Sequence, residues 1–205
     1  AMFTDNETEW EEARGLVYQW GRKDPFVKDR FYEGMVNAPA TYKTSYDQVS
    51  IETTIANPDT FYGVEHSFWI NSSNASLWTK SKKTIYDPCP SGWRVPDTSI
   101  MDGWNTGSAE IHDGYKKINP PYSTPAAYYP IADRIGGFAM SCGFDNFFIW
   151  TTTHGYYLYS HSSDTQFTIS NGMGNDTRMV VRCMKETTMS GDSNEGYTES
   201  DDYEW

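Results

Sequence analysis

The chain has 205 residues, a net charge of −12, 16% aromatic residues and only 21% charged residues. The acidic balance argues against nucleic-acid binding, which needs a basic face, and against adsorption to anionic lipid. No run approaches the 18 apolar residues of a membrane span, so we expect no direct membrane insertion. Low charge combined with many Trp and Tyr residues predicts a folded, β-rich chain.

The first third of the chain contains short elements separated by irregular segments. Residues 1–14 read as an acidic lead-in, and the abrupt start without a visible secretory signal suggests a fragment of a longer protein. The apolar run 15–21 between two glycines predicts a buried strand or a helical turn. Residues 50–56 predict a short helix that Ser50 caps and Asn57-Pro58 ends. Trp69 and Trp78 flank a turn-rich segment as aromatic anchors.

Residues 86–96 form a dense corner with three prolines, one glycine, one cysteine and one tryptophan. Proline fixes φ and glycine permits positive φ, so this composition predicts a rigid, irregular turn. We expect Trp93 to be a core anchor and Arg94, on the opposite face, to pair with a carboxylate or cap carbonyls. Asp97 then provides a signal for the start of a short helix.

The second half predicts a β-meander of short strands rich in aromatic and β-branched residues. The predicted strands are residues 126–131, 137–141, 147–153, 156–160, 165–169 and 177–184. Residues 187–205 carry many acids and almost no aliphatic residues, which predicts a flexible tail. Tyr197, Tyr203 and Trp205 leave open a tail that docks on the domain. We therefore expect one domain over residues 1–186 and a tail beyond it.

The three cysteines, Cys89, Cys142 and Cys183, show no CxxC spacing, which argues against a zinc site. Their odd number allows one disulfide and one free thiol, and the spacing alone leaves the pair open. No Gly-rich phosphate loop, HExxH or GxSxG motif is present. The sequence therefore predicts a protein without catalytic residues, metal or cofactor.

Four segments together resemble the major paralogous domain first noted in Fibrobacter, with Cys-Pro-Ser-Gly-Trp-Arg-Val-Pro as the most specific motif. This family is common in surface lipoproteins and fimbria-associated proteins of Bacteroides-type bacteria. The resemblance covers roughly residues 14–186 and implies a C-type-lectin-like fold of the α+β class. Short helices would flank a small, twisted antiparallel sheet with long loops. The segments are residues 15–25, 83–96, 150–153 and 180–184.

The resemblance also implies a disulfide between Cys89 and Cys183, which would leave Cys142 as a free thiol. It implies an exported protein at the extracellular or outer-membrane surface, where disulfides persist. Calcium-dependent lectins use Glu-Pro-Asn or Gln-Pro-Asp in a loop and Trp-Asn-Asp on a strand, and this chain has neither motif. The departure argues against sugar binding through calcium.

A narrower resemblance is to the variable proteins of diversity-generating retroelements, which place randomised residues near the C-terminus of this fold. Adenine mutagenesis of Asn codons cannot yield Lys, Glu, Gln, Met or Trp. Residues 144–177 contain no Lys, Glu or Arg and are dense in Phe, Tyr, Thr, Ser, Asn, Asp and His. Trp150, Gln166 and Met173 would then be fixed positions. An undiversified binding surface rich in Tyr, Ser and Asn would have the same composition.

Strand alternation divides this segment into inward and outward side chains. The predicted inward set is Phe148, Trp150, Leu158, Phe167 and Ile169. The predicted ligand-binding set is Asp145, Asn146, Phe147, Thr152, His154, Tyr156, Tyr157, Tyr159, His161, Ser163, Asn171, Met173 and Asn175. Its aromatic residues would anchor a ligand and its polar residues would set specificity.

The sequence thus predicts a non-enzymatic ligand-binding domain, an adhesin of a surface or fimbria-associated protein. Its partner would be a protein or glycan on another cell surface. One alternative is a structural pilus or cell-surface assembly subunit whose aromatic face docks a neighbouring pilin subunit. Another is a glycan-binding or sulfatase-modifying-like enzyme, which would need convergent titratable groups in a cleft.

Overall fold

The computed structural model describes residues 16–26, 43–45, 47–62, 69–70, 76–101, 109–112, 115–119, 127–130, 146–172 and 177–186. Statements about the structure below concern these residues. The predicted lead-in 1–14, the predicted strand 137–141, Cys142 and the predicted tail 187–205 lie outside them.

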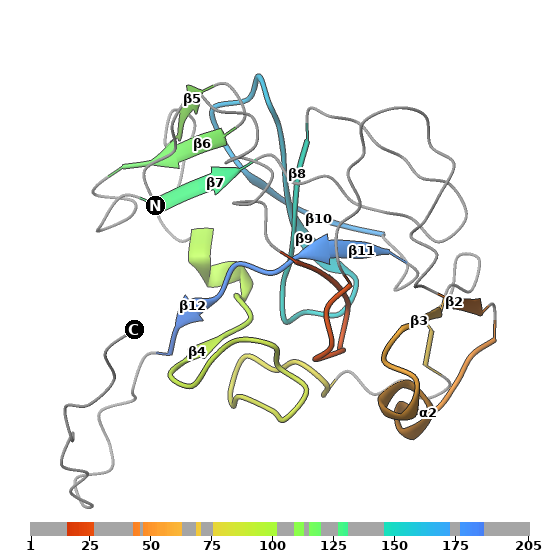
Figure 1. The fold of residues 1–205 in the computed structure, drawn as a ribbon. Coiled ribbons are helices and arrows are strands. Elements are labelled where there is room, and N and C mark those ends of the chain that lie inside the picture. The colour runs from red at the N-terminus through yellow and green to blue at the C-terminus, as the bar shows by residue number, and fades with distance from the viewer. Residues whose placement is uncertain are drawn as a thin grey trace, which may run out of the picture.

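A five-stranded sheet forms the centre of the fold, with strand order β1-β11-β8-β9-β10 (Figure 1). Strands β8, β9 and β10 form an antiparallel meander, while β11 runs parallel to β8 and antiparallel to β1. The meander agrees with the sequence prediction for residues 147–169. The strands are β1 (Val17–Gln19), β8 (Asn146–Trp150), β9 (Tyr156–His161), β10 (Thr168–Asn171) and β11 (Arg178–Val180).

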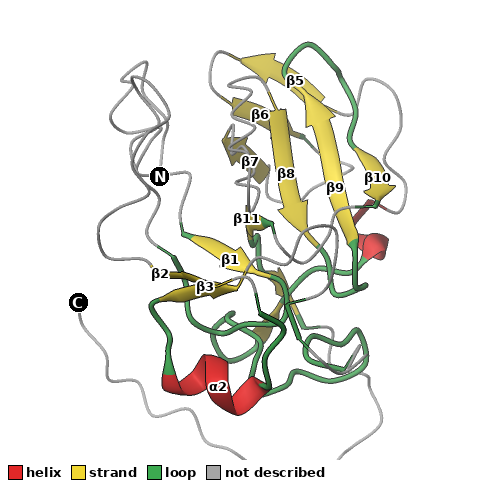
Figure 2. Ribbon diagram, turned by 90° about the vertical axis from the view of Figure 1, so that its right-hand side faces the viewer, coloured by secondary structure: helices red, strands yellow, loops and turns green. Residues whose placement is uncertain are grey.

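Three smaller sheets and two short helices surround the central sheet. The antiparallel sheet β5-β6-β7 packs beside β8 and β9 (Figure 2), and two strand pairs lie nearer the other end. The elements are β2 (Lys43–Ser45), α2 (Ile51–Ala56), β3 (Thr60–Tyr62), β4 (Trp93–Arg94), the 3₁₀ helix η1 (Thr98–Met101), β5 (Ala109–His112), β6 (Tyr115–Ile118), β7 (Ala127–Pro130) and β12 (Met184–Lys185). Strand β2 pairs with β3, and β4 pairs with β12.

The predicted α+β class, with short helices flanking a small sheet, is wrong. Of the described residues 42% lie in strands and 9% in helices, and α2 is their single α-helix. Both helix-start signals are real, since the Ser50 hydroxyl accepts the Thr53 N–H at 3.3 Å and Asp97 accepts the Ser99 N–H at 2.8 Å. The second signal starts only the single turn η1, because a cap satisfies orphan donors but does not extend a helix. No helix in the described part of the chain is long and apolar enough to cross a bilayer.

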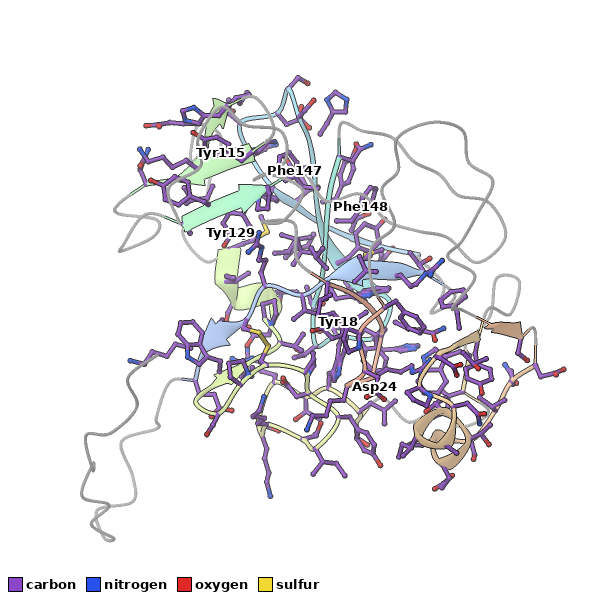
Figure 3. All side chains as sticks on the ribbon, in the orientation of Figure 1. Tyr18, Asp24, Tyr115, Tyr129, Phe147 and Phe148 are labelled. Carbon is purple, nitrogen blue, oxygen red and sulfur yellow. A yellow bond between two sulfur atoms is a disulfide. The ribbon has the colours of Figure 1, made fainter. Side chains whose placement is uncertain are left out.

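Strands β8 and β11 at the centre of this sheet are buried on both faces, so the sheet separates two hydrophobic cores. Phe147, Ile149 and Leu158 face a core shared with the β5-β6-β7 sheet. The alternate residues Phe148 and Trp150 face a second core, which holds four of the five tryptophans in the described part of the chain. Figure 3 shows Phe147 toward Tyr129 of β7, with Phe148 on the other side of β8. Side chains that alternate along β8 therefore reach two different interiors.

Four buried tryptophans bind the second core together through their indole N–H groups. Each indole donates to a backbone carbonyl of another segment, at 2.8–3.0 Å. Buried indoles need such a partner because an unmade hydrogen bond in the interior costs free energy. The pairs are Trp20 to Thr151, Trp69 to Trp20, Trp78 to Tyr86 and Trp150 to Tyr18.

The corner at residues 86–96 is organised by the buried carboxylate of Asp87. Its oxygens accept the N–H groups of Cys89 at 2.8 Å and Val95 at 2.9 Å, and they pair with Lys83 Nζ at 2.8 Å. Arg94 is buried and pairs with Asp97 at 2.5 Å, which confirms the expected carboxylate partner. Trp93 is 43% exposed, so its prediction as a core anchor is wrong. The Asp87 carboxylate holds the turn closed, and Trp93 points outward from the two-residue strand β4.

The predicted disulfide joins Cys89 to Cys183, with an S–S distance of 2.07 Å and a Cα–Cα distance of 5.7 Å. It ties the Asp87 corner to the segment between β11 and β12. The two cysteines are separated by 94 residues, so the bond constrains a long loop of the unfolded chain.

We expect removal of this disulfide to lower the free energy of unfolding by about 4–5 kcal/mol, from the loop-closure entropy of the unfolded chain. The measurement is urea unfolding of the oxidised protein and of the Cys89→Ser/Cys183→Ser variant. Dithiothreitol should shift the oxidised protein toward the variant and leave the variant unchanged. Equal midpoints for oxidised and reduced protein would contradict the prediction.

Candidate ligand-binding face

The predicted ligand-binding residues do not form one surface. Asp145, Met173 and Asn175 lie outside the described residues. Of the others, the structure buries some and divides the rest between the two faces of the β8-β9-β10 meander, because neighbouring residues on a strand point in opposite directions.

Phe147, Thr152 and Tyr157 are at most 5% exposed, so the prediction that they point outward is wrong. Phe147 points into the core beneath β5-β6-β7, and Tyr157 packs against Phe148 with ring centroids 5.7 Å apart. The Thr152 N–H donates to the Pro96 carbonyl at 2.8 Å, which fixes the segment after β8 against the Asp87 corner. Ile169 shows the opposite error: it was predicted to be inward and is 45% exposed, because it lies on the outermost strand.

His154 packs against the second hydrophobic core, which we call the tryptophan core, and is not part of a ligand surface. Its ring makes an edge-to-face contact with Trp20 at a centroid distance of 4.5 Å. Burial lowers the pKa of His154 below its ordinary value, because a low-dielectric surrounding disfavours the charged imidazolium. This side chain supports the turn between β8 and β9.

One group of polar residues does share a surface, which we call the Tyr159 face. The register places Asn146 opposite His161, Thr168 opposite Tyr159 and Ser170 opposite Tyr157, and paired residues point to the same side of a sheet. Thr168 is exposed, and the other members are half-buried. The face consists of Asn146, Tyr159, His161, Thr168 and Ser170.

Hydrogen bonds and ring contacts fix the side chains at the centre of the Tyr159 face. The Tyr159 hydroxyl donates to Asn146 Oδ1 at 3.1 Å. Its ring packs on Phe148, with centroids 5.2 Å apart and planes inclined at 47°. The Thr168 hydroxyl donates to the Tyr159 carbonyl at 3.3 Å. Strand β8 therefore holds the partly exposed Tyr159 ring in a defined position, and β10 holds the backbone of the same residue.

The turn after β9 supplies the polar end of the Tyr159 face. His161 Nδ1 and Ser163 Oγ lie 2.8 Å apart and share a hydrogen bond. The Asp164 carboxylate accepts the His161 N–H at 3.3 Å, and the Asp164 N–H donates back to the His161 carbonyl at 3.0 Å. Ser163, a predicted ligand-binding residue, is exposed at the tip of this turn.

Tyr156 and Asn171 lie on the opposite side of the sheet from the Tyr159 face. They are paired across β9 and β10, and both are exposed. Ile169, two residues before Asn171 on the same strand, shares their side. The predicted site is thus two surfaces that meet at the free edge of β10.

Lys116 of β6 anchors the β9–β10 turn from beneath, and sequence reasoning missed it. Its side chain is fully buried, and its ammonium donates to Ser160 Oγ and to the carbonyls of His161 and Asp164, both at 2.5 Å. The ammonium also lies 4.9 Å from the Phe147 ring centroid. A signal existed: in Tyr115-Lys-Lys-Ile118 strand alternation places Lys116 on the same side as the buried Ile118.

Burial lowers the pKa of Lys116 to about 8, and the nearby Asp164 charge opposes that shift only in part. The Lys116–Ser160 contact has the composition of a base and a nucleophile, but Ser160 is 1% exposed and Lys116 is 0% exposed. Because both side chains are buried, we interpret the pair as one that positions the β9–β10 turn. No cluster of three or more His, Cys, Asp or Glu residues suited to a metal occurs among the described residues.

The segment that forms β8, β9 and β10 is nearly free of charge. Between residues 146 and 172 the sequence contains one carboxylate, Asp164, and no Lys or Arg. The chain as a whole carries 28 acidic residues, so this depletion is local. Charge depletion together with Tyr, His, Asn, Ser and Thr is typical of the centre of a protein recognition surface.

The lowered pKa of Lys116 makes a specific prediction for stability at alkaline pH. Between pH 8 and about 10.4 the unfolded chain binds a proton at this lysine that the folded chain has released, so folding becomes more favourable as pH rises. Relative to Lys116→Met, the wild type should gain roughly 2–3 kcal/mol in unfolding free energy across this window.

Urea unfolding of both proteins at a series of pH values measures the difference between their free energies of unfolding. The exposed Lys82→Met variant is the matched control for loss of a lysine charge. A difference in unfolding free energy between wild type and Lys116→Met that stays constant with pH would contradict the lowered pKa of Lys116.

Comparison of the chain with protein-family models, with curated proteins and with solved structures finds no significant match.

Proposed function

We propose that the protein is a non-enzymatic ligand-binding domain, an adhesin of an exported surface or fimbria-associated protein, and that it binds through the Tyr159 face. The observation that carries the proposal is the local composition of this face. Aromatic, hydroxyl and amide side chains replace charge on one side of an ordered meander, in a chain of net charge −12.

The rigidity of the meander supports binding in preference to a purely structural surface. Tyr159 is held by Asn146 and Phe148, and the adjacent turn is anchored by Lys116. Side chains that are already fixed lose little conformational entropy when a ligand is bound. Tyr also offers a large contact area with few rotatable bonds.

The chemistry of the Tyr159 face suits a protein or glycan on another cell surface. Hydroxyl and amide groups donate and accept hydrogen bonds, and the Tyr159 ring provides a flat apolar contact. The Cys89–Cys183 disulfide supports export, because such bonds persist in oxidising compartments. We therefore propose the extracellular or outer-membrane surface as the location of the protein.

We expect lysines introduced on the Tyr159 face to weaken binding roughly tenfold or more, since buried charge is costly at the centre of an interface. The test uses the fluorescently labelled domain on a glycan microarray and on cultured epithelial cells. Any captured probe is then titrated with the Thr168→Lys/Ser170→Lys variant.

The control for this titration is Ser81→Lys/Ser91→Lys, which adds the same charge at exposed serines far along the chain from the meander. It should retain the wild-type affinity. A probe that binds both variants equally well would show that the Tyr159 face is not the binding surface.

Diversification by a retroelement is a separate part of the proposal, and the structure limits which positions it would serve. Phe147 and Tyr157 are core residues, so variation there would disturb packing. Positions such as Tyr156, His161 and Asn171 can vary with little cost to the cores.

The genomic neighbourhood tests diversification directly. We expect a reverse-transcriptase gene beside a near-copy of the codons for residues 144–183, with differences at adenines of the copy. A neighbourhood without such a copy would remove the diversification and leave ligand binding as proposed.

A further inference from the structure

The two edge strands of the central sheet differ in how they are protected from pairing with another strand. At one edge, β1 is closed by its own chain: the Val17 N–H donates to the Phe26 carbonyl at 3.3 Å, and the Phe26 N–H donates to the Val17 carbonyl at 2.8 Å. At the other edge, β10 is the outermost strand of the sheet order (Figure 2). Proteins usually protect such an edge with charge, proline or a covering segment.

Strand β10 carries neither charge nor proline, and no segment within the described residues pairs with its outer edge. Its sequence, Thr-Ile-Ser-Asn, contains no charged residue and no proline. Every residue of the strand is exposed or half-exposed, and Ile169 is 45% exposed. An uncharged, exposed edge strand is a template for pairing with another strand.

The hydrogen bonds of β9 show which backbone groups of β10 point outward. The Thr151 N–H donates to the Tyr156 carbonyl, so the backbone of Tyr156 faces β8. In an antiparallel sheet successive residues bond to alternate neighbours, so Tyr157 and Tyr159 bond to β10. Their register partners are Ser170 and Thr168.

It follows that Ile169 and Asn171 direct their N–H and C=O groups away from β9, toward the free edge. Neither residue makes a backbone hydrogen bond to another segment within the described part of the chain. Four backbone groups, an N–H and a C=O from each residue, are therefore presented in a row at the edge of the sheet.

We propose that β10 pairs antiparallel with β10 of a second copy of this chain, about a twofold axis at Ser170. In this register Ile169 of each copy lies opposite Asn171 of the other and exchanges both backbone hydrogen bonds with it. Ser170 then lies opposite Ser170, where two small uncharged side chains fit without repulsion. The two central sheets become one.

A second copy is the occupant that the chemistry favours. The pairing is self-complementary, as a twofold interface requires, and it opposes no charged side chains. On the side away from the Tyr159 face, Ile169 and the 37% exposed Tyr156 provide apolar surface that pairing would cover. The net charge of −12 opposes association only at longer range, where salt screens it.

The pairing also has a consequence for binding, which rests on the proposed function. A twofold axis perpendicular to the sheet places both Tyr159 faces on the same side of the dimer. Two faces in fixed geometry bind a repeated cell-surface ligand with avidity that a single face lacks.

Sedimentation equilibrium of the purified protein tests the pairing without any ligand, so its failure would leave the proposed function standing. We expect a monomer–dimer equilibrium that strengthens between about 0.05 M and about 0.5 M NaCl, as the repulsion is screened. Ile169→Lys and Asn171→Pro should each weaken dimerisation at least tenfold, since the first places a charge in the edge strand of each copy and the second removes an outward N–H.

The matched control is Ile85→Lys, the same substitution at an isoleucine that is 77% exposed and not part of the sheet. It should dimerise as the wild type does. A protein that stays monomeric at every concentration and salt level, or a dimer that Ile169→Lys leaves intact, would overturn the proposal.

Amide hydrogen exchange provides a second readout that does not depend on variants. The amides of Ile169 and Asn171 should exchange fast in dilute protein and become protected as concentration rises. Those of Thr168 and Ser170 bond to β9 and should be protected at every concentration. Unprotected Ile169 and Asn171 amides in a concentrated sample would exclude the strand pairing.

Discussion

The structure depends on the hydrogen bonds that four buried indole groups make to backbone carbonyls. Trp20 is the centre of this arrangement: its indole donates to the Thr151 carbonyl, and its own carbonyl accepts the indole of Trp69. The β1 segment, the end of β8 and the segment around Trp69 are thereby joined at one residue. A displaced tryptophan would leave both an indole N–H and a carbonyl unsatisfied in the interior, which makes alternative packings costly.

This constraint decides where a binding surface can form. The tryptophan core occupies one side of the central sheet at the β8–β9 turn, and the β5-β6-β7 layer occupies the other side. Many of the aromatic residues in 146–172 are therefore committed to packing. What remains for recognition is the far end of the meander and its outer strand, where Tyr159, His161 and Thr168 are accessible.

The sequence predicted local features better than it predicted the architecture. The Ser50 cap, the Arg94 carboxylate partner and the β8-β9-β10 meander were correct because each depends on neighbouring residues alone. The Cys89–Cys183 pairing came from a family resemblance, since the spacing of three cysteines could not identify it. The fold class was wrong because a helix cap identifies where a helix starts and contains no information about its length.

The errors within the candidate site share a different cause. The alternation of side chains along a strand divides them between two sides. It identifies which side is buried only when the other side is exposed to solvent. Here both sides of β8 are buried, so Phe147 and Phe148 are both in a core. Conversely, Ile169 looks like a core residue by composition and is exposed because of its position in the strand order, which only the tertiary structure reveals.

Lys116 connects the two surfaces that matter for function. Its ammonium holds the His161 and Asp164 carbonyls, so it fixes the turn from which β10 returns along β9. The position of His161 on the Tyr159 face and the direction of the β10 edge therefore depend on one buried cation. A positive charge placed beneath an uncharged surface costs desolvation, as its lowered pKa shows. That cost is offset by an ordered turn, whose hydrogen bonds leave the face and the edge free for other molecules.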